Sequence, residues 1–106
     1  MFSRILQLAD RPSTLIPVHV SIPVEDGMDW SCSCSIGWPE GLWERHTIGI
    51  DAIQAIELAL RMVGTELYAS NQHRSGQLMW LERGAGYGFP VPAVIKDQLI
   101  GEDRSL

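Results

Sequence analysis

The chain has 106 residues, the size of one domain, and a hydrophobic core can form at this length. Thirteen acidic residues against eight basic ones give a formal net charge of −5. Nucleic-acid binding needs clustered Lys and Arg, so this balance argues against a nucleic-acid partner and favours a basic protein partner. No apolar run approaches the roughly 18 residues of a membrane span. We therefore expect a cytoplasmic protein with no membrane contact, formed by one domain over residues 1–106 with a flexible tail at 101–106.

Two segments near the N-terminus have the pattern of strands. Residues 2–8 are the weaker candidate, whereas residues 16–24 carry apolar side chains at every even position. This period of two is typical of a strand with one buried face. Pro17 and Pro23 lack the amide hydrogen that a ladder needs, so this strand is predicted to lie at an edge of the sheet or to be paired only briefly there.

Residues 28–36 form the next predicted strand and pair with the previous one as a hairpin. Its apolar face consists of Met28, Trp30, Cys32, Cys34 and Ile36. A three-residue loop at 25–27 keeps the apolar faces of both strands on one side of the sheet. That loop also puts Gly27 at the position that needs left-handed backbone. In this register Ile22 lies opposite Trp30, and Val20 opposite Cys32.

Two surfaces around this hairpin are candidates for binding a protein partner. The acidic turn could steer a basic partner by charge, or it is simply solvated. The loop 37–43 holds two Trp side chains, which either fold over the core or anchor a partner, and the packing argument favours the first alternative. The candidate partner-binding residues are Glu25, Asp26, Asp29, Trp38, Glu40 and Trp43.

A strand and a long helix follow the Trp loop. Residues 45–50 are predicted to form a strand with Ile48 and Ile50 facing inward. Asp51 followed by Gln54 has the spacing of a capping box and predicts a helix start. The apolar stripe of this helix consists of Ile53, Ile56, Leu60, Val63 and Leu67. The helix is predicted to end at about Ser70.

The last third of the chain is less regular. Residues 77–82 are predicted to form a strand, 84–88 a flexible glycine-rich turn, and 92–100 a short helix. The sequence therefore predicts an α+β fold, with an antiparallel sheet of about four to five strands and one long helix packed on one face.

No group of residues has the spacing of a catalytic, cofactor or metal site. Cys32 and Cys34 could share zinc with His19 or His46, but small core residues are the more economical interpretation. His73 falls in the polar stretch 71–76 and is expected to be solvated. We therefore predict no enzyme activity, no cofactor and no metal ion. The alternative is a small-ligand or enzymatic site on the polar face of the hairpin, formed by His19, Ser21, Ser31, Ser33 and Ser35.

A helix-start signature and a closing segment carry a family resemblance. The helix starts with GIDAIQA at 49–55 and continues through LAL at 58–60 and GTEL at 64–67, and Trp80-Leu81 and GFP at 88–90 follow. Together these segments resemble a family of short bacterial proteins known only as a domain of unknown function. For a small acidic protein, we take this resemblance to imply an immunity protein encoded beside a secreted toxin. The resemblance implies a fold and carries no catalytic residues.

These observations favour a non-enzymatic protein-binding domain. Its most concrete form is an immunity protein that neutralises a basic bacterial toxin by direct occlusion. A structural homodimer, joined through an edge strand or the Trp loop, is a further alternative.

Overall fold

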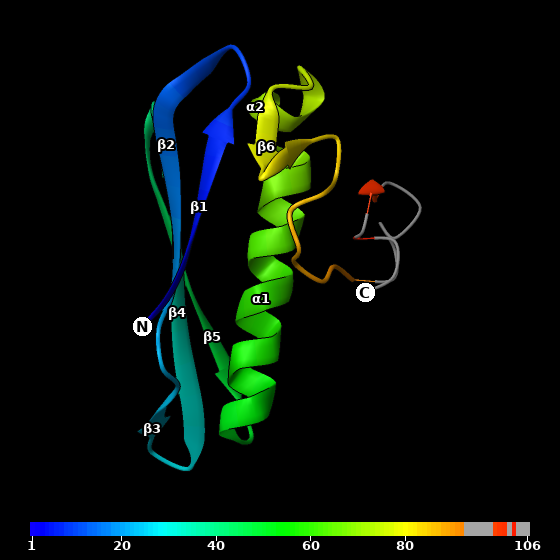
Figure 1. Ribbon diagram of the computed structural model, residues 1–106. Helices are drawn as coiled ribbons and strands as arrows, with labels where there is room; N and C mark the ends of the chain where they lie inside the picture. Colours follow the sequence, from blue (N-terminus) through cyan, green and yellow to red (C-terminus); the bar gives the residue numbers. More distant parts are fainter. Residues whose placement is uncertain (93–98, 102, 104–106) are drawn as a thin grey trace.

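The computed structural model describes residues 1–92, 99–101 and 103 as a two-layer α+β structure. One long helix, α1 (Ala52–Ala69), packs on one face of an antiparallel sheet (Figure 1). The strands are β1 (Phe2–Leu8), β2 (Arg11–Val20), β3 (Val24–Asp26), β4 (Asp29–Trp38), β5 (Gly41–Gly49), β6 (Leu78–Trp80) and β7 (Glu82–Arg83). The predicted fold class is confirmed, and the sheet is larger than predicted. No helix in the described part of the chain is long and apolar enough to cross a membrane.

Along the hydrogen-bonded path the strands follow the order β3-β4-β2-β1-β6-β7. β3 and β2 pair with different parts of the same edge of β4, residues 29–31 and 34–36, and β5 pairs with the other edge. The edge position predicted for residues 16–24 is therefore wrong, because β2 lies between β1 and β4. The alternative of only brief pairing fits the ladder to β4, which covers Val18–Val20. The amide of Ser21 donates to the carbonyl of Ser33, so alternate residues of β2, Pro17 included, face β4. Since Pro17 has no amide to donate, the ladder to β4 ends beside it.

An extra residue between β2 and β3 changes the predicted hairpin. Val20 lies opposite Cys34 and Val24 opposite Ser31, so β2–β3 has one residue more than β4 over the same span. This bulge, at 21–23, moves Val24 to the face opposite to Val20. The predicted three-residue loop is wrong: Asp26 pairs with Asp29 around a two-residue turn, in which Gly27 has φ +67°.

The face assigned to β5 is also wrong. Ile48 and Ile50 are exposed, and Thr47 and Gly49 face α1 instead. The Thr47 hydroxyl donates to the carbonyl of Ala55 at 2.8 Å, which satisfies a polar group in the core. A Cβ on Gly49 would lie 2.5 Å from the Ala55 amide nitrogen, so the strand and helix touch through their backbones.

Helix α1 starts at the predicted capping box. The Asp51 carboxylate accepts from the Gln54 amide at 2.8 Å, and the Gln54 side chain accepts from the Ile50 amide. Small residues let the helix approach the sheet, and its buried side is Ala55, Ala59, Val63, Gly64, Leu67 and Tyr68. Ile56 and Leu60 flank this side, whereas Ile53, assigned to the stripe by its spacing, is 75% exposed. The helix ends at Ala69 with Ser70 as its cap, as predicted.

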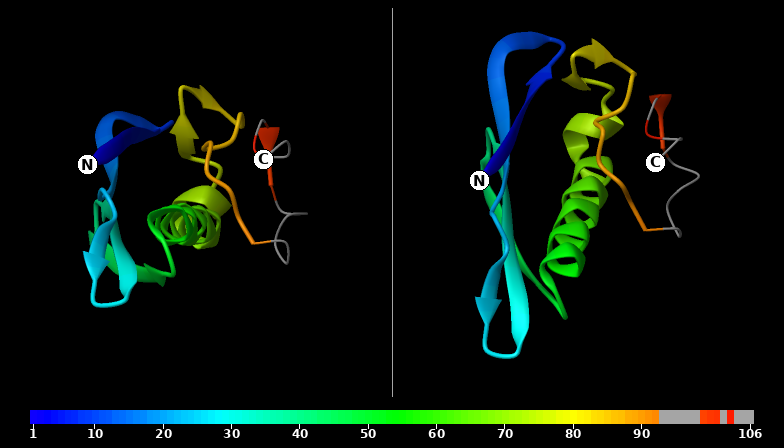
Figure 2. Two further views of the ribbon diagram at one scale, coloured as in Figure 1. Left: turned by 90° about the horizontal axis from the view of Figure 1, so that it is seen from below. Right: turned by 60° about the horizontal axis from the view of Figure 1, so that its bottom comes forward.

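The chain then returns over the far side of α1. After α2 (Asn71–Arg74), β6 pairs with β1, and the predicted strand at 77–82 is split into β6 and β7 around Leu81, which has φ +65°. Residues 84–92 run along α1 on the side away from the sheet (Figure 2). A Cβ on Gly64 would lie 2.3 Å from the Pro90 carbonyl, so glycine is needed at this crossing. Most of the predicted helix at 92–100 and of the predicted tail at 101–106 lies outside the described residues.

Candidate functional site

The end of the molecule that holds the β3–β4 turn and the start of α1 combines acidic and exposed apolar side chains. Both elements lie at the same end in Figure 1. The acidic residues are Glu25, Asp26, Asp29 and Asp51, all exposed. The exposed apolar residues are Ile22 (60%), Val24 (56%), Met28 (99%), Ile50 (76%) and Ile53 (75%). Neither contributing segment, 21–31 or 48–57, contains a Lys or Arg. We call these nine residues the acidic–apolar end.

The Trp residues lie at the other end of β4. Trp38 pairs with Gly41 around the turn between β4 and β5, so the predicted loop 37–43 is largely strand. Trp38 and Trp43 are half-buried and pack against the core, and Glu40 accepts from the Gln72 amide at 2.9 Å. Asp29 and Trp38 are the two ends of one strand, about 30 Å apart at the rise of an extended chain. The six candidate partner-binding residues therefore form two separate groups.

The polar face of the hairpin is the side of the sheet that α1 leaves uncovered. His19 lies opposite Ser35, and Ser35 opposite Glu44. Ser21 and Ser33 are neighbours, and Ser31 continues the face along β4. A hollow of about 90 Å³ opens here, lined by Met1, His19, Ser21, Ser33, Cys34, Ser35 and Glu44. The Nδ1 atom of His19 is buried without a hydrogen-bond partner among the described residues.

The sheet separates the two thiols from the histidines considered as zinc ligands with them. Cys32 and Cys34 are buried under α1, whereas His19 and His46 belong to the polar face. Burial, with the neighbouring Cys32 as a smaller cause, raises the pKa of the Cys34 thiol to about 11. A protonated, buried thiol is a poor nucleophile and a poor ligand, so Cys34 acts as a core residue.

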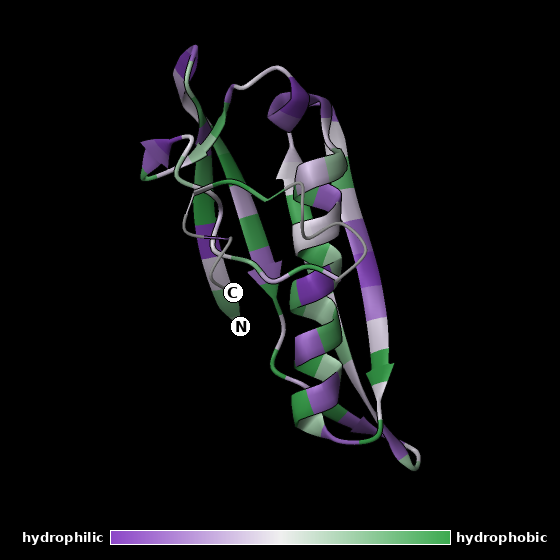
Figure 3. Ribbon diagram, turned by 90° about the vertical axis from the view of Figure 1, so that its right-hand side faces the viewer, coloured by the Kyte–Doolittle hydropathy of each residue, from purple (hydrophilic) through white to green (hydrophobic). Residues whose placement is uncertain are grey.

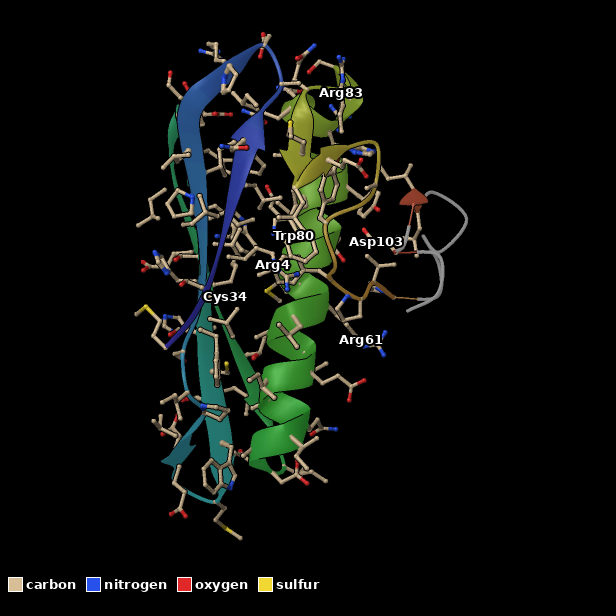
Figure 4. The ribbon with its side chains drawn as sticks, in the orientation of Figure 1. Arg4, Cys34, Arg61, Trp80, Arg83 and Asp103 are labelled. Atoms are coloured by element: carbon tan, nitrogen blue, oxygen red, sulfur yellow. The ribbon has the colours of Figure 1, made fainter. Side chains whose placement is uncertain are left out.

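A buried polar cluster joins the end of α1 to the C-terminal residues. Asp103 is fully buried and accepts from the Tyr68 hydroxyl at 2.6 Å and from the amides of Tyr87 and Gly88 at 2.8 and 2.6 Å. The Arg4 guanidinium donates to the carbonyls of Tyr87 and Gly88 and stacks on Trp80 (Figure 4). Three donors satisfy the carboxylate, as a buried charge requires.

His73 belongs to this cluster and is not solvated as predicted. Its Nδ1 lies 2.5 Å from the Tyr87 hydroxyl, and its ring packs edge-on against Tyr68. Burial, with Arg74 as a smaller cause, lowers the pKa of His73, and burial raises the pKa of Tyr87. The protonated phenol is therefore the donor to a neutral imidazole. Tyr68 and Tyr87 are both buried, so this cluster packs as part of the core.

An open groove lies between β5 and α1. It has a volume of about 720 Å³. Its apolar walls are Trp43, Leu58, Met62 and Pro92, and Arg45, Arg61 and Glu66 lie at its polar margin. His46 and Ile48 also border it along the edge of β5, although in the strand register their side chains belong to the other face. Leu58 and Met62 are 40% and 36% exposed. We call this cavity the β5–α1 groove.

Several of these exposed residues were not predicted as site residues. Alternation assigned Ile22, Val24 and Met28 to the core, although Pro23 and Gly27 in the same stretch signal irregular backbone. Leu58 and Met62 are four residues apart and lie outside the predicted apolar stripe. Such a second pair of apolar residues on a helix is the signal that could have indicated the groove.

Comparison with known proteins places this chain in a family but gives no function. Neither a curated protein nor a solved structure matches the chain. A family profile described as "Domain of unknown function (DUF6968)" matches residues 2–91, which include the whole sheet and α1. The chain therefore belongs to the DUF6968 family, and the predicted membership of a domain-of-unknown-function family is confirmed.

Proposed function

We propose that this protein is a non-enzymatic binding domain that holds a basic protein partner at the acidic–apolar end. One observation carries the proposal: five exposed apolar side chains share this end with four carboxylates and no cationic side chain from the same segments. Exposed apolar patches with a polar rim are typical of protein-binding surfaces. Carboxylates around the patch attract a cationic surface over a distance and repel an anionic one.

The most concrete form of this function is an immunity protein that occludes a basic toxin. A net charge of −5 supports fast association with a cationic partner at low salt. The β3–β4 turn projects from the body of the molecule and could enter a concave surface, such as a toxin's active-site cleft (Figure 1). We place this function in the cytoplasm, which fits the free, buried thiols of Cys32 and Cys34.

The test is a titration of the purified chain with the purified product of the adjacent gene, followed by calorimetry. We expect a one-to-one complex whose dissociation constant rises steeply with salt. Met28→Ser combined with Asp26→Asn should weaken binding at least about tenfold, because an apolar anchor and a steering charge are both lost. Met28 is an exposed turn residue and Asp26 the exposed last residue of β3, so the fold should be retained.

A matched control uses comparable changes elsewhere on the surface. Leu81→Ser and Glu82→Gln alter an exposed apolar residue and an exposed acid away from the acidic–apolar end, and the affinity should stay within about twofold. Equal losses in both variants, or no binding of the neighbouring gene product by the unaltered protein, would overturn the proposal.

A further inference from the structure

The free edge of β5 exposes a continuous row of backbone hydrogen-bonding groups. Among the described residues β5 pairs only with β4 and forms one border of the sheet, beside α1 (Figure 3). The Ser33 amide and carbonyl face β2, so even-numbered residues of β4 face β5. Through the β4–β5 register these residues exchange hydrogen bonds with Trp43, Arg45 and Thr47. The amides and carbonyls along this edge therefore belong to Leu42, Glu44, His46 and Ile48. Of these groups, the Glu44 carbonyl accepts from the Arg45 guanidinium at 2.7 Å, a bond that must open when a second strand pairs here.

The side chains at these four positions are complementary to themselves when the strand is reversed. An antiparallel pair of β5 strands centred on Arg45 sets Leu42 opposite Ile48 of the second copy, and Glu44 opposite His46 of the second copy. Leu42 is 67% and Ile48 52% exposed, and Glu44 and His46 are also exposed. Apolar pairs such as Leu42 with Ile48, and hydrogen-bonding pairs such as Glu44 with His46, stabilise neighbouring strands. We propose that a second copy of this chain pairs with β5 and extends the sheet across a two-fold axis.

The same pairing covers the β5–α1 groove on the other face. The side chains of Trp43 and Thr47 point to the α1 side of β5, so in the dimer they lie opposite Thr47 and Trp43 of the second copy. The groove of each copy then opens onto the groove of the other. The exposed Leu58 and Met62 of both copies face a shared apolar space, whose burial drives the association.

One pair in this arrangement is unfavourable. Arg45 lies on the two-fold axis and meets Arg45 of the second copy, and like charges directly opposite each other weaken a strand pair. Its guanidinium lies 5.2 Å from the Trp43 ring centre and donates to the Glu44 carbonyl, which directs the charge along its own strand. Arg45 therefore limits the strength of the dimer, and we expect it to dissociate on dilution.

The experiment is sedimentation equilibrium of the purified full-length chain over a range of concentrations at neutral pH. We expect a reversible monomer–dimer equilibrium. Arg45→Thr should tighten it, because the repulsion on the axis is removed. Glu44→Lys should weaken it at least about tenfold, because the carboxylate acceptor opposite His46 is lost. The exchange Glu44→Lys with His46→Glu should restore it, since a Lys–Glu pair then takes the place of the Glu–His pair.

One further variant separates loss of pairing from loss of fold. His46→Pro removes an amide that faces away from β4, so circular dichroism should be retained while the dimer is lost. The same changes should leave binding at the acidic–apolar end intact, so the two proposals fail independently. A monomer at every concentration, a dimer that survives His46→Pro, or a dimer weakened by Arg45→Thr would overturn the inference.

Discussion

At the scale of single residues, His73 couples stability to pH. Its pKa is lowered in the folded state, because burial and Arg74 disfavour the charged imidazole. The unfolded chain takes up a proton near pH 6.5, whereas folded His73 resists it until lower pH. The unfolded state therefore binds more protons in this window, and stability falls as pH drops below about 6.5.

His73→Gln should remove this part of the pH dependence. Glutamine can still accept from the Tyr87 hydroxyl, which lies 2.5 Å from Nδ1 in the native protein, but it does not titrate. Urea denaturation at pH 7.5 and at pH 5.5 measures the effect as the difference in unfolding free energy. The unaltered protein should lose more stability between these pH values than the variant. Equal losses would mean that His73 is charged in the folded state as readily as in the unfolded one.

At the scale of elements, the contact between α1 and residues 84–92 depends on Gly64. Helix propensity alone predicts that Gly64→Ala stabilises the helix by about 1 kcal/mol. The added Cβ would lie 2.3 Å from the Pro90 carbonyl and 3.0 Å from a Val91 methyl group, so the crossing segment must move. We expect the packing loss to win, with a net destabilisation of about 1–3 kcal/mol.

Thermal unfolding checks this balance against a neighbouring substitution. Thr65→Ala raises helix propensity at the next residue, which is half-buried, and should leave the melting temperature unchanged or slightly higher. A Gly64→Ala protein that melts higher than the unaltered protein would show that residues 84–92 adapt without cost.

The elements that sequence predicts well are those whose signals are local. The Asp51 cap and the end of α1 at Ala69 depend on residues within one turn, and both are as predicted. The inward face of β5 is different. Hydrophobicity predicts that Ile48 is buried and Thr47 exposed. Thr47 is buried instead, because the Ala55 carbonyl of α1 accepts a hydrogen bond from its hydroxyl. Tertiary contacts of this kind leave no trace in the local pattern.

The sequence indicates only part of the acidic–apolar end. Glu25, Asp26 and Asp29 were predicted as partner-binding candidates from charge, and they lie on the acidic–apolar end. The bulge at 21–23 adds Ile22 and Val24 to that end, and a one-residue insertion changes the face of every residue beyond it. Alternation therefore misassigned the two aliphatic residues that make the surface apolar.

At the scale of the whole molecule, the surface proposed to bind a partner and the surface proposed to form the dimer are separate. The acidic–apolar end lies at one tip of the sheet, whereas the dimer seam runs along β5 at its side. Antiparallel pairing of β5 would direct the two acidic–apolar ends in opposite directions. Each copy could then hold its own partner, and the complex would contain two copies of each protein.

The fold also depends on residues beyond the segment that defines the family. The family match ends at residue 91, but Asp103 and Leu99 are 0% and 3% exposed. Asp103 accepts from Tyr68, which is 35 residues away, and from the Tyr87 and Gly88 amides. Without this carboxylate, the buried Tyr68 hydroxyl and Tyr87 amide and the half-buried Gly88 amide lose their acceptor.

Asp103→Ala should therefore destabilise the protein by about 3 kcal/mol, the cost of leaving buried partners of a charged group unpaired. A chain that ends at Pro92 should lose this amount and about 1.5–3 kcal/mol more, because the buried Leu99 side chain is also removed. Urea denaturation at pH 7 measures both differences, and Tyr68→Phe, which removes one of the three donors, should fall between the unaltered protein and Asp103→Ala. If the shortened chain is as stable as the full one, residues 1–92 form the complete folding unit and Asp103 only rests against it.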